Sequence, residues 1–494
     1  MVSLINTEDI MAEQSLKDKT VKGVGWSAAD AIIGQVVSFI VSLILARLLS
    51  PSEYGLIGIA TIFIIILSGF VDCGFSNALI RKKEVSDNDY NTMFVTNLVM
   101  SVVVFIILFI CAPFIADFFE LQEVSSVLRI LALILVIQSV SLVQNTILTK
   151  RIDFKTKTKA TIVAAIISGT VGITMAFCGW GVWALVAQQI TSQIVNTLCL
   201  CVFNKWMPKF TFYGASFYYM WGFGWKLMLS GFLNRTWEQL YQAVVGKCYM
   251  PATLGQYSRA NQFAQVFSSN FTAIFQRVTY PALSEVRDDK QRMIAAYRKI
   301  IKISMFITAV CMISLGAIAE PLIYCLIGEQ WHQAATFLPL ICVYMSLYPL
   351  HSINLNMLQV QGRSDIFLFL EIVKKIMAIG PLCLGVFINI YWMLWGSVLC
   401  GIFSFFLNTY YTGKKLGYTS WHQLKDIAPS YIIAFIIAGS VYFFKYLPVS
   451  NFVILPVQLV VGVVVFFTIC EYFKLEEYVE IKRIVTDCIR KYKK

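Results

Sequence analysis

Apolar residues gather in fourteen successive runs along the chain, and short polar segments separate these runs. A helix needs about 20 mainly apolar residues to cross the hydrocarbon core of a bilayer. The pattern therefore predicts an all-α, polytopic membrane protein with about 14 transmembrane helices, near residues 24–48, 54–76, 91–116, 124–148, 160–178, 181–203, 219–247, 253–277, 299–318, 333–358, 366–388, 391–411, 427–446 and 450–471.

The composition supports a membrane protein. Of the 494 residues, 58% are hydrophobic and only 14% are charged, and the mean hydropathy is +0.70. Soluble domains contain roughly 45–50% apolar and about 25% charged residues, so this surplus cannot be buried in one soluble core. A soluble domain, a secreted disulfide scaffold, a disordered chain and a nucleic-acid-binding domain are thereby excluded.

The positive charges indicate the orientation of the chain. The formal net charge is +12, from 40 Lys and Arg against 28 Asp and Glu. With the N-terminus placed in the cytoplasm, 31 of these basic residues fall in cytoplasmic segments and 4 in outer segments. Cytoplasmic loops of membrane proteins collect Lys and Arg. We therefore expect both termini to be cytoplasmic, and a nucleic-acid partner is not needed to explain the charge.

Cysteines, histidines and the N-terminal segment give no sign of a cofactor or of cleavage. The 13 Cys lie in apolar runs without a CxxC pair, and the three His are far apart. We expect no metal site and no cofactor. Residues 1–23 carry four acidic residues, and the first apolar run is longer than the core of a signal peptide. We therefore expect this run to be kept as the first span.

The chain carries an internal repeat at an offset of 200 residues. Without a gap, the following pairs match: Arg47 with Lys247, Pro51 with Pro251, Gly55 with Gly255, and Ala60 with Ala260. Repeats of six spans each have the same orientation in the membrane, and transporters built this way bind substrate between the halves. The predicted organisation is a cytoplasmic segment (1–23), an N-lobe (24–203), a cytoplasmic linker (204–218), a C-lobe (219–411), two further spans (412–472) and a basic cytoplasmic tail (473–494).

Several motifs resemble those of a known transporter family. They are Lys22-Gly23-x-x-Trp26, Ala46-Arg47-Leu48-Leu49-Ser50-Pro51-x-x-Tyr54-Gly55, Asp72-x-Gly74-x-x-x-Ala78-Leu79-Ile80, Leu254-Gly255-x-Tyr257-Ser258-Arg259-Ala260 and Tyr280-Pro281-x-Leu283-Ser284. The chain resembles the Wzx-type polysaccharide, O-antigen and teichuronic-acid exporters of the multidrug/oligosaccharidyl-lipid/polysaccharide flippase superfamily. The resemblance implies two six-helix lobes, often with two further helices. It also implies transport of sugar units linked to undecaprenyl diphosphate across the bacterial inner membrane.

The seventh and eighth predicted spans concentrate the ionisable residues inside the bilayer. A charge at the centre of a membrane helix costs about 2.5–3.5 kcal/mol, so such residues are candidates for function. In the seventh span, Lys226, Asn234 and Glu238 share one face, and Arg235 is spaced to pair with Glu238. Arg235 is placed near the midplane, where a diphosphate could meet it. The alternative is that Arg235 and Glu238 form a structural ion pair.

Other candidates lie outside the seventh span. Arg259 and Asn261 are expected to line an aqueous cavity with the seventh span, although Arg259, like Lys226, could instead extend to the membrane surface. Lys374 and Lys375 either serve the cavity or are compensated locally by a nearby glutamate. Asp30 is a candidate for ion coupling, with packing against polar neighbours as the alternative.

These residues favour a flippase that moves a lipid-linked oligosaccharide by alternating access, for O-antigen, capsule or exopolysaccharide biosynthesis. The expected partners are undecaprenyl diphosphate-linked sugars, membrane lipids and possible polysaccharide assembly machinery. The alternative is a cation-coupled multidrug exporter of the same superfamily, for which an acidic cavity is expected. An enzyme is not expected, because the longest outer connections, near 117–123 and 319–332, carry no convincing catalytic constellation.

Overall fold

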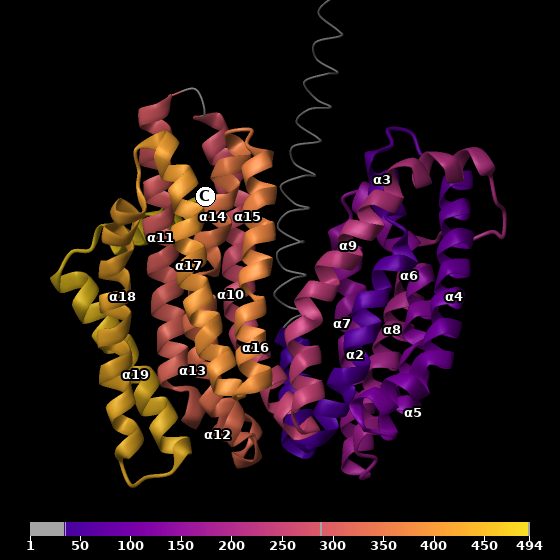
Figure 1. Cartoon of the computed structure of the whole chain (residues 1–494), viewed down its shortest axis with the longest axis horizontal. Helices are drawn as coiled ribbons and strands as arrows, with labels where there is room; N and C mark the ends of the chain where they lie inside the picture. Colours follow the sequence, from indigo (N-terminus) through magenta and orange to yellow (C-terminus); the bar gives the residue numbers. More distant parts are fainter. Residues whose placement is uncertain (1–33, 35, 287–288, 493–494) are drawn as a thin grey trace, which may run out of the picture. The chain divides into compact units, whose positions relative to one another are not determined.

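The computed structural model describes residues 34, 36–286 and 289–492. Within them every regular element is helical (Figure 1). The helices form two compact units, Met1–Gly255 and Gln256–Lys494, called unit 1 and unit 2 below. A polytopic all-α membrane protein, as the apolar pattern predicts, is thereby confirmed.

Unit 1 begins with a short apolar helix over Val36–Leu48. It continues with α2 (Pro51–Asp72), α3 (Phe75–Arg81), α4 (Asp87–Phe119), α5 (Glu123–Leu131), α6 (Leu133–Lys150), α7 (Phe154–Phe177), α8 (Val182–Asn204) and α9 (Gly214–Cys248). The next helix, α10 (Pro251–Glu285), starts in unit 1 and leads into unit 2. Unit 2 then contains α11 (Lys290–Ala317), α12 (Ala319–Ile327), η1 (Glu329–Trp331), α13 (His332–Ser346), α14 (Tyr348–Val360), α15 (Ser364–Met377), α16 (Ile379–Phe387), α17 (Ile390–Leu416), α18 (Ser420–Tyr442), η2 (Phe443–Tyr446), α19 (Asn451–Tyr472) and α20 (Glu476–Tyr492).

Each predicted span overlaps one helix or two consecutive helices of the described residues, and of the first span, 24–48, only residues 34 and 36–48 are described. Ten helical segments are long and apolar enough to cross a membrane. The other four predicted spans are the first helix, the polar helices α9 and α10, and the pair α15–α16, which is interrupted at Ala378. The number of fourteen spans therefore stays a prediction.

Capping residues move the start of two helices away from the apolar pattern. The Ser50 backbone N–H donates to the Glu53 carboxylate at 2.6 Å, and the Ser50 hydroxyl accepts from the Glu53 N–H. This capping box starts α2 at Pro51 instead of near residue 54. Ser86 and Asp89 form the same arrangement at the start of α4. Both helices therefore begin with a polar first turn, several residues before their apolar part.

Helices α2 and α10 cross backbone to backbone at their first turns. A Cβ atom built on Gly55 would lie 1.9 Å from the carbonyl oxygen of Pro251, and one built on Gly255 would lie 2.0 Å from that of Pro51. No side chain fits between them, because both obstructing atoms belong to the backbone. The contact is reciprocal: the glycine of each segment meets the proline of the other. It supports the duplication that the offset of 200 residues indicates.

Helix α9 packs closely along α2 within unit 1. A Cβ on Gly74 would lie 2.4 Å from the carbonyl oxygen of Gly224. Near the other end of α9, a Cβ on Gly246 would lie 3.3 Å from the Ile59 side chain. Small residues therefore let α9 lie directly on α2. The predicted lobes of 24–203 and 219–411 differ from the two units here, since α9 opens the predicted C-lobe but packs in unit 1.

An ion pair between an exposed arginine and a buried aspartate joins α11 to α18 in unit 2. Arg298 donates from Nε and Nη2 to the two carboxylate oxygens of Asp426, at 2.5 and 2.6 Å. Tyr418 donates to the same carboxylate at 2.7 Å. The Asp426 side chain is only 5% exposed, so these donors replace the water it gives up.

We expect Gly55→Ala to destabilise the protein. An added methyl group at a fully packed position costs typically about 1–3 kcal/mol, since the helices must move apart. Gly439→Ala is a matched control, because a Cβ there meets no atom within 4 Å, and it should raise stability by about 0.5–1 kcal/mol. Thermal unfolding of the purified proteins in detergent measures the difference. Equal melting temperatures for the two variants would show that the crossing is not tightly packed.

Candidate functional site

Arg235 lies on the face of α9 that packs against α2. Its Nη1 donates to the Ser68 hydroxyl and, at 3.4 Å, to the carbonyl oxygen of Ile65. The Ser68 hydroxyl in turn donates to the Ile65 carbonyl at 2.8 Å, so it can accept from the guanidinium. Gly69 faces the arginine stem, and a Cβ there would lie 3.7 Å from Arg235 Cδ, an ordinary van der Waals distance.

The depth of Arg235 along α9 makes it unusual among the basic residues. Counted from Cys248, where α9 ends, Arg235 lies about 20 Å along the helix at 1.5 Å per residue. The hydrocarbon core of a bilayer is about 30 Å thick, so this position is deep within it. The side chain is half-buried against α2.

The Arg235 guanidinium keeps donors to spare. An arginine carries five N–H donors. Within the part of the chain that the structure describes, Arg235 donates only from Nη1 and forms no ion pair with a carboxylate. The Asp72 carboxylate, one helical turn beyond Ser68, attracts it electrostatically but accepts its own hydrogen bonds from Ser76. A planar pair of donors is thus left for an anion.

The predicted ion pair between Arg235 and Glu238 is wrong. Glu238 instead accepts from Asn234 Nδ2 at 2.8 Å. The reason is packing: the face that carries Arg235 lies on α2, whereas Asn234 and Glu238 are exposed. Lys226 is also exposed, beside the Trp225 ring at 5.9 Å. Lys226, Asn234 and Glu238 therefore remain candidates for contact with a ligand on the exposed side of α9.

Arg259 is held inside unit 2. It is only 6% exposed, donates to Gln262 Oε1 at 2.5 Å, and lies 5.9 Å from the centre of the Trp331 ring. This burial excludes extension of the side chain to the membrane surface. Asn261, two residues further along α10, is half-buried.

The polar side chains of α10 divide between packing and exposure. Gln256 donates to the Gln330 carbonyl at 2.6 Å and accepts from the Ala334 N–H at 2.9 Å. Ser268 donates to the Met345 carbonyl at 3.1 Å. Gln265, in contrast, is exposed. Some of the polar side chains that predict a water-filled cavity along α10 therefore form hydrogen bonds that hold α10 to η1 and α13.

Lys374 donates to Glu371 on the same helix, and both are partly buried. This contact agrees with the alternative stated for Lys374, in which a nearby glutamate compensates its charge and the lysine does not serve the cavity. Lys375 is half-buried. Next to this pair, His351 Nδ1 lies 3.4 Å from Asn408 Nδ2. Asp30 lies outside the described residues.

Comparison with known proteins adds to this geometry. Residues 44–336 match the model of a family described as polysaccharide biosynthesis protein. The succinoglycan biosynthesis transport protein ExoT of Rhizobium meliloti is 24% identical over 368 residues, which cover 74% of each chain. The lipopolysaccharide biosynthesis protein WzxC of Escherichia coli is 23% identical over 377 residues, covering 75% of this chain and 76% of WzxC.

Solved structures share the fold. The lipid II flippase MurJ in an inward closed conformation superposes with a TM-score of 0.72 at 14% identity, covering 90% of this chain and 98% of MurJ. An inward-facing multidrug resistance MATE family transporter of the MOP superfamily gives a TM-score of 0.60 at 18% identity, covering 78% of this chain and 96% of that one. A flippase and a multidrug transporter thus share this fold, so the fold alone does not identify the cargo.

Removal of the Ser68 hydroxyl should weaken the hydrogen bonding that holds the Arg235 guanidinium against α2. Hydrogen bonds to charged groups contribute about 1.5–3 kcal/mol, so we expect Ser68→Ala to lower stability by about this amount. Ser440→Ala is the matched control, because Ser440 makes the same bond to the carbonyl three residues before it, at 2.7 Å, without accepting from a cation. Thermal unfolding compares the two. A cost no larger for Ser68→Ala would mean that the hydroxyl does not hold the guanidinium.

Proposed function

The chain belongs to the polysaccharide biosynthesis protein family, and from this we propose that it moves a lipid-linked oligosaccharide across the membrane for the synthesis of a surface polysaccharide. Relatives named for transport in succinoglycan biosynthesis and for lipopolysaccharide biosynthesis support the proposal. So does the fold shared with a lipid II flippase. The carrier we propose is undecaprenyl diphosphate, in the bacterial inner membrane.

The observation that carries the proposal is the position of Arg235 deep along α9, with hydrogen-bond donors that have no partner among the described residues. The headgroup of such a lipid joins a diphosphate to sugars, and neither crosses hydrocarbon unaided. Arg235 lies deep along α9 and leaves its Nε and Nη2 donors without partners among the described residues. A guanidinium binds phosphate oxygens with two parallel, charge-assisted hydrogen bonds. Arg235 would therefore hold the diphosphate while the lipid tail stays in the bilayer.

Neighbouring polar residues of α9 have secondary roles in this proposal. Asn234, Glu238 and Lys226 are exposed on α9 and would contact sugar hydroxyls or the second phosphate. Among the other predicted residues, Arg259 is buried against Trp331, and Lys374 is bonded to Glu371. We assign Arg259, Asn261, Lys374 and Lys375 to support of the second unit, and we keep Asp30 as a candidate for ion coupling.

Transport would follow the alternating exposure of the bound headgroup to the two sides. In transporters built from parallel repeats, one half moves against the other around a fixed site near the midplane. An inside-negative potential favours outward movement of negative charge, by about 2.3 kcal/mol per charge per 100 mV. Polysaccharide assembly machinery would receive the lipid on the outer side. The protein would catalyse no covalent step.

The alternative is a cation-coupled multidrug exporter, since a MATE transporter shares the fold. Such a carrier needs ionised carboxylates in its cavity to attract cationic drugs. Here Glu371 is paired with the Lys374 ammonium, and Glu238 accepts from the neutral Asn234 amide and keeps its charge on the exposed side of α9. Arg235, on the side that faces α2, keeps donors to spare and has no carboxylate partner among the described residues. The balance of free groups therefore favours an anionic cargo.

We expect Arg235→Ala to reduce export of the lipid-linked oligosaccharide by about 10- to 150-fold. That range corresponds to loss of about 1.5–3 kcal/mol of charge-assisted hydrogen bonding. Arg292→Ala is the control, because the Arg292 side chain is 80% exposed and pairs only with a neighbour on its own segment. Export is measured as surface polysaccharide in a strain that depends on the plasmid copy, with protein abundance checked in membranes. Normal export by Arg235→Ala would remove this residue from the mechanism.

A second prediction separates the two classes of transporter. Overproduction of the protein should leave susceptibility to cationic drugs unchanged, because the free charge beside α2 is positive and repels them. Minimum inhibitory concentrations of a drug panel, compared with those of a strain carrying the Arg235→Ala variant, provide the measurement. Resistance that depends on the wild-type protein would support the multidrug alternative.

A further inference from the structure

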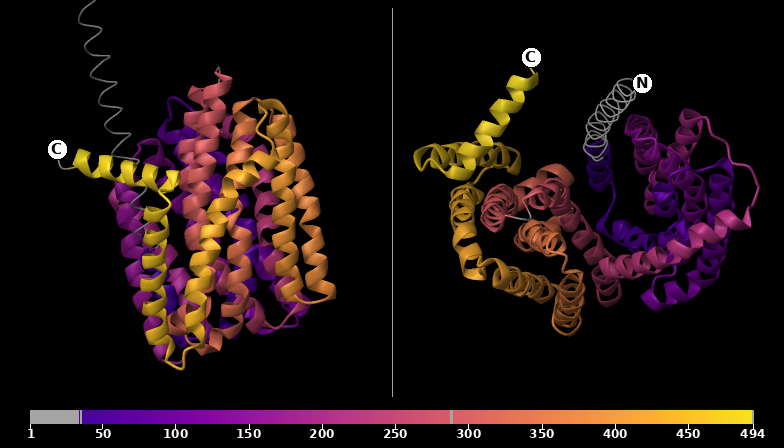
Figure 2. Two further views of the ribbon diagram at one scale, coloured as in Figure 1. Left: turned by 90° about the vertical axis from the view of Figure 1, so that its left-hand side faces the viewer. Right: turned by 90° about the horizontal axis from the view of Figure 1, so that it is seen from above.

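The chain turns sharply after its last membrane helix. Helix α19 ends at Tyr472, and Lys474 adopts the left-handed conformation with φ of +45°. Beyond this turn α20 runs at a steep angle to α19 instead of continuing it, as Figure 2 shows for the yellow C-terminal helix. Tyr472 and Phe473 at the turn are 80% and 66% exposed. Exposed aromatic residues at the end of a membrane helix mark the level of the lipid headgroups.

One face of α20 is docked on unit 2 by apolar contacts. Tyr478 and Ile481 of α20, together with Leu475 directly before it, pack against the core that Phe306 and Ile437 help to form. These contacting residues recur every three positions, as expected for one helix face. The orientation of α20 is therefore fixed by the fold and is not that of a free tail.

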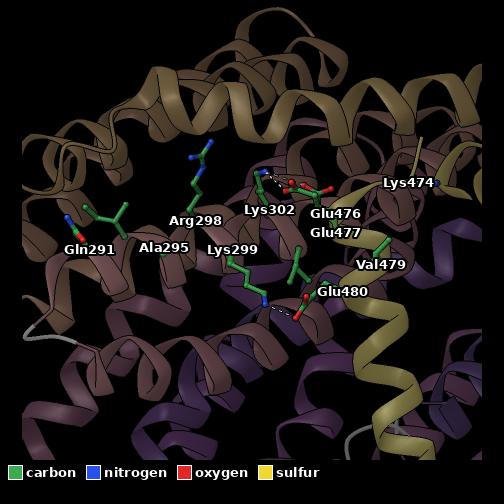
Figure 3. Close-up of a pocket in the computed structure, with 12 residues that line it drawn as sticks. Gln291, Ala295, Arg298, Lys299, Lys302, Lys474, Glu476, Glu477, Val479 and Glu480 are labelled. Carbon is green, nitrogen blue, oxygen red and sulfur yellow. Dashed lines mark hydrogen bonds and ion pairs between the residues drawn. The ribbon is translucent and has the colours of Figure 1, made fainter. Parts of the chain in front are cut away.

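The three glutamates in the first turns of α20, Glu476, Glu477 and Glu480, form ion pairs with lysines of α11. Lys299 donates to Glu480 at 2.6 Å, and Lys302 donates to Glu476 at 3.3 Å (Figure 3). Lys302 also lies 3.9 Å from Glu477. The Lys299 hydrogen bond lowers the pKa of the Glu480 carboxyl below its ordinary value, so the contact is between full charges at neutral pH.

A groove of about 980 Å³ separates α11 from α20, and acidic and basic side chains both line it (Figure 3). Because Lys299 and Lys302 pair across it with glutamates of α20, the groove offers no surplus of one charge. An anion would have to break these ion pairs to enter. The groove is therefore not a binding site for an anion.

The surplus of positive charge lies on the opposite face of α20. Val479, Lys482, Arg483, Thr486 and Arg490 are exposed, and their spacing of three and four residues places them on one face. Lys482 pairs with Glu471 at 2.6 Å, whereas neither Arg483 nor Arg490 forms an ion pair within the described chain. From residue 482 to the end, the sequence contains six basic residues and one acidic residue.

We propose that α20 is an interfacial helix whose basic face, defined by Lys482, Arg483 and Arg490, binds the headgroups of anionic phospholipids. Basic clusters that directly follow a membrane helix are attracted to the anionic headgroups of the adjoining leaflet. The docking of the acidic side on α11 leaves the basic side to face the lipid. This leaflet would be the cytoplasmic one, where the tail is expected. The proposal is independent of the cargo.

Hydrogen–deuterium exchange of the segment 476–492 tests the proposal in the full chain. The protein is placed in nanodiscs of phosphatidylcholine alone or of phosphatidylcholine mixed with phosphatidylglycerol. We expect exchange in the mixed discs to be slower by about tenfold, because several basic residues each gain from the anionic surface. In about 1 M salt the difference should vanish, since the screening length falls to about 3 Å.

Two triple variants make the outcome specific. Lys482→Gln/Arg483→Gln/Arg490→Gln should abolish the difference between the discs. Lys83→Gln/Lys159→Gln/Lys290→Gln removes the same charge from exposed positions elsewhere and should preserve it. Equal exchange in both kinds of disc, or protection that survives the α20 substitutions, would overturn the proposal. So would equal protection by inorganic phosphate in phosphatidylcholine discs, which would point to a free anion instead of a lipid surface.

Discussion

The structure depends on one constraint, which is that a polar group inside a bilayer must find its partner within the protein. Water is absent there, and an unsatisfied polar group costs several kcal/mol. Arg235 meets this constraint in part through α2, where a serine hydroxyl and a main-chain carbonyl accept hydrogen bonds from its Nη1. Gly74, directly after α2, and Gly224 of α9 bring the two backbones into contact near one end of the α2–α9 packing. The packing of α9 against α2 therefore determines where the Arg235 charge lies.

The helices could be predicted from the sequence because the bilayer imposes a length on every apolar run. Their starts could be predicted less well, since polar capping residues such as Ser50 and Ser86 precede the apolar part. The partners of charged side chains could not be predicted. A spacing of three residues allows Arg235 and Glu238 to pair, but only the packing of α9 shows that they point to different surroundings.

The structural role of some polar residues could not be predicted from the sequence, because these residues lie at the ends of predicted spans. Arg298 and Asp426 each fall just before an apolar run, so they resemble ordinary loop charges. In the structure they form a two-point ion pair that ties α11 to α18. The only available signal was that both positions immediately precede long spans. Contacts between segments more than a hundred residues apart carry no local sequence pattern.

The family places the chain among polysaccharide biosynthesis proteins, and our proposal for the cargo rests on the charges of the candidate site. A flippase and a multidrug transporter share this architecture, so their difference must come from the side chains of the site. In this chain Glu371 is paired with a lysine and Glu238 is hydrogen-bonded to an asparagine, whereas the arginine beside α2 retains unused donors. That asymmetry suits a phosphorylated headgroup better than a cation.

The most direct measurement is an experimental structure of the full chain in nanodiscs with a bound polyprenyl diphosphate sugar. The account predicts diphosphate density within hydrogen-bonding distance of Arg235 Nε and Nη2. Density of the diphosphate at another place, with the Arg235 guanidinium turned toward acyl chains, would contradict it.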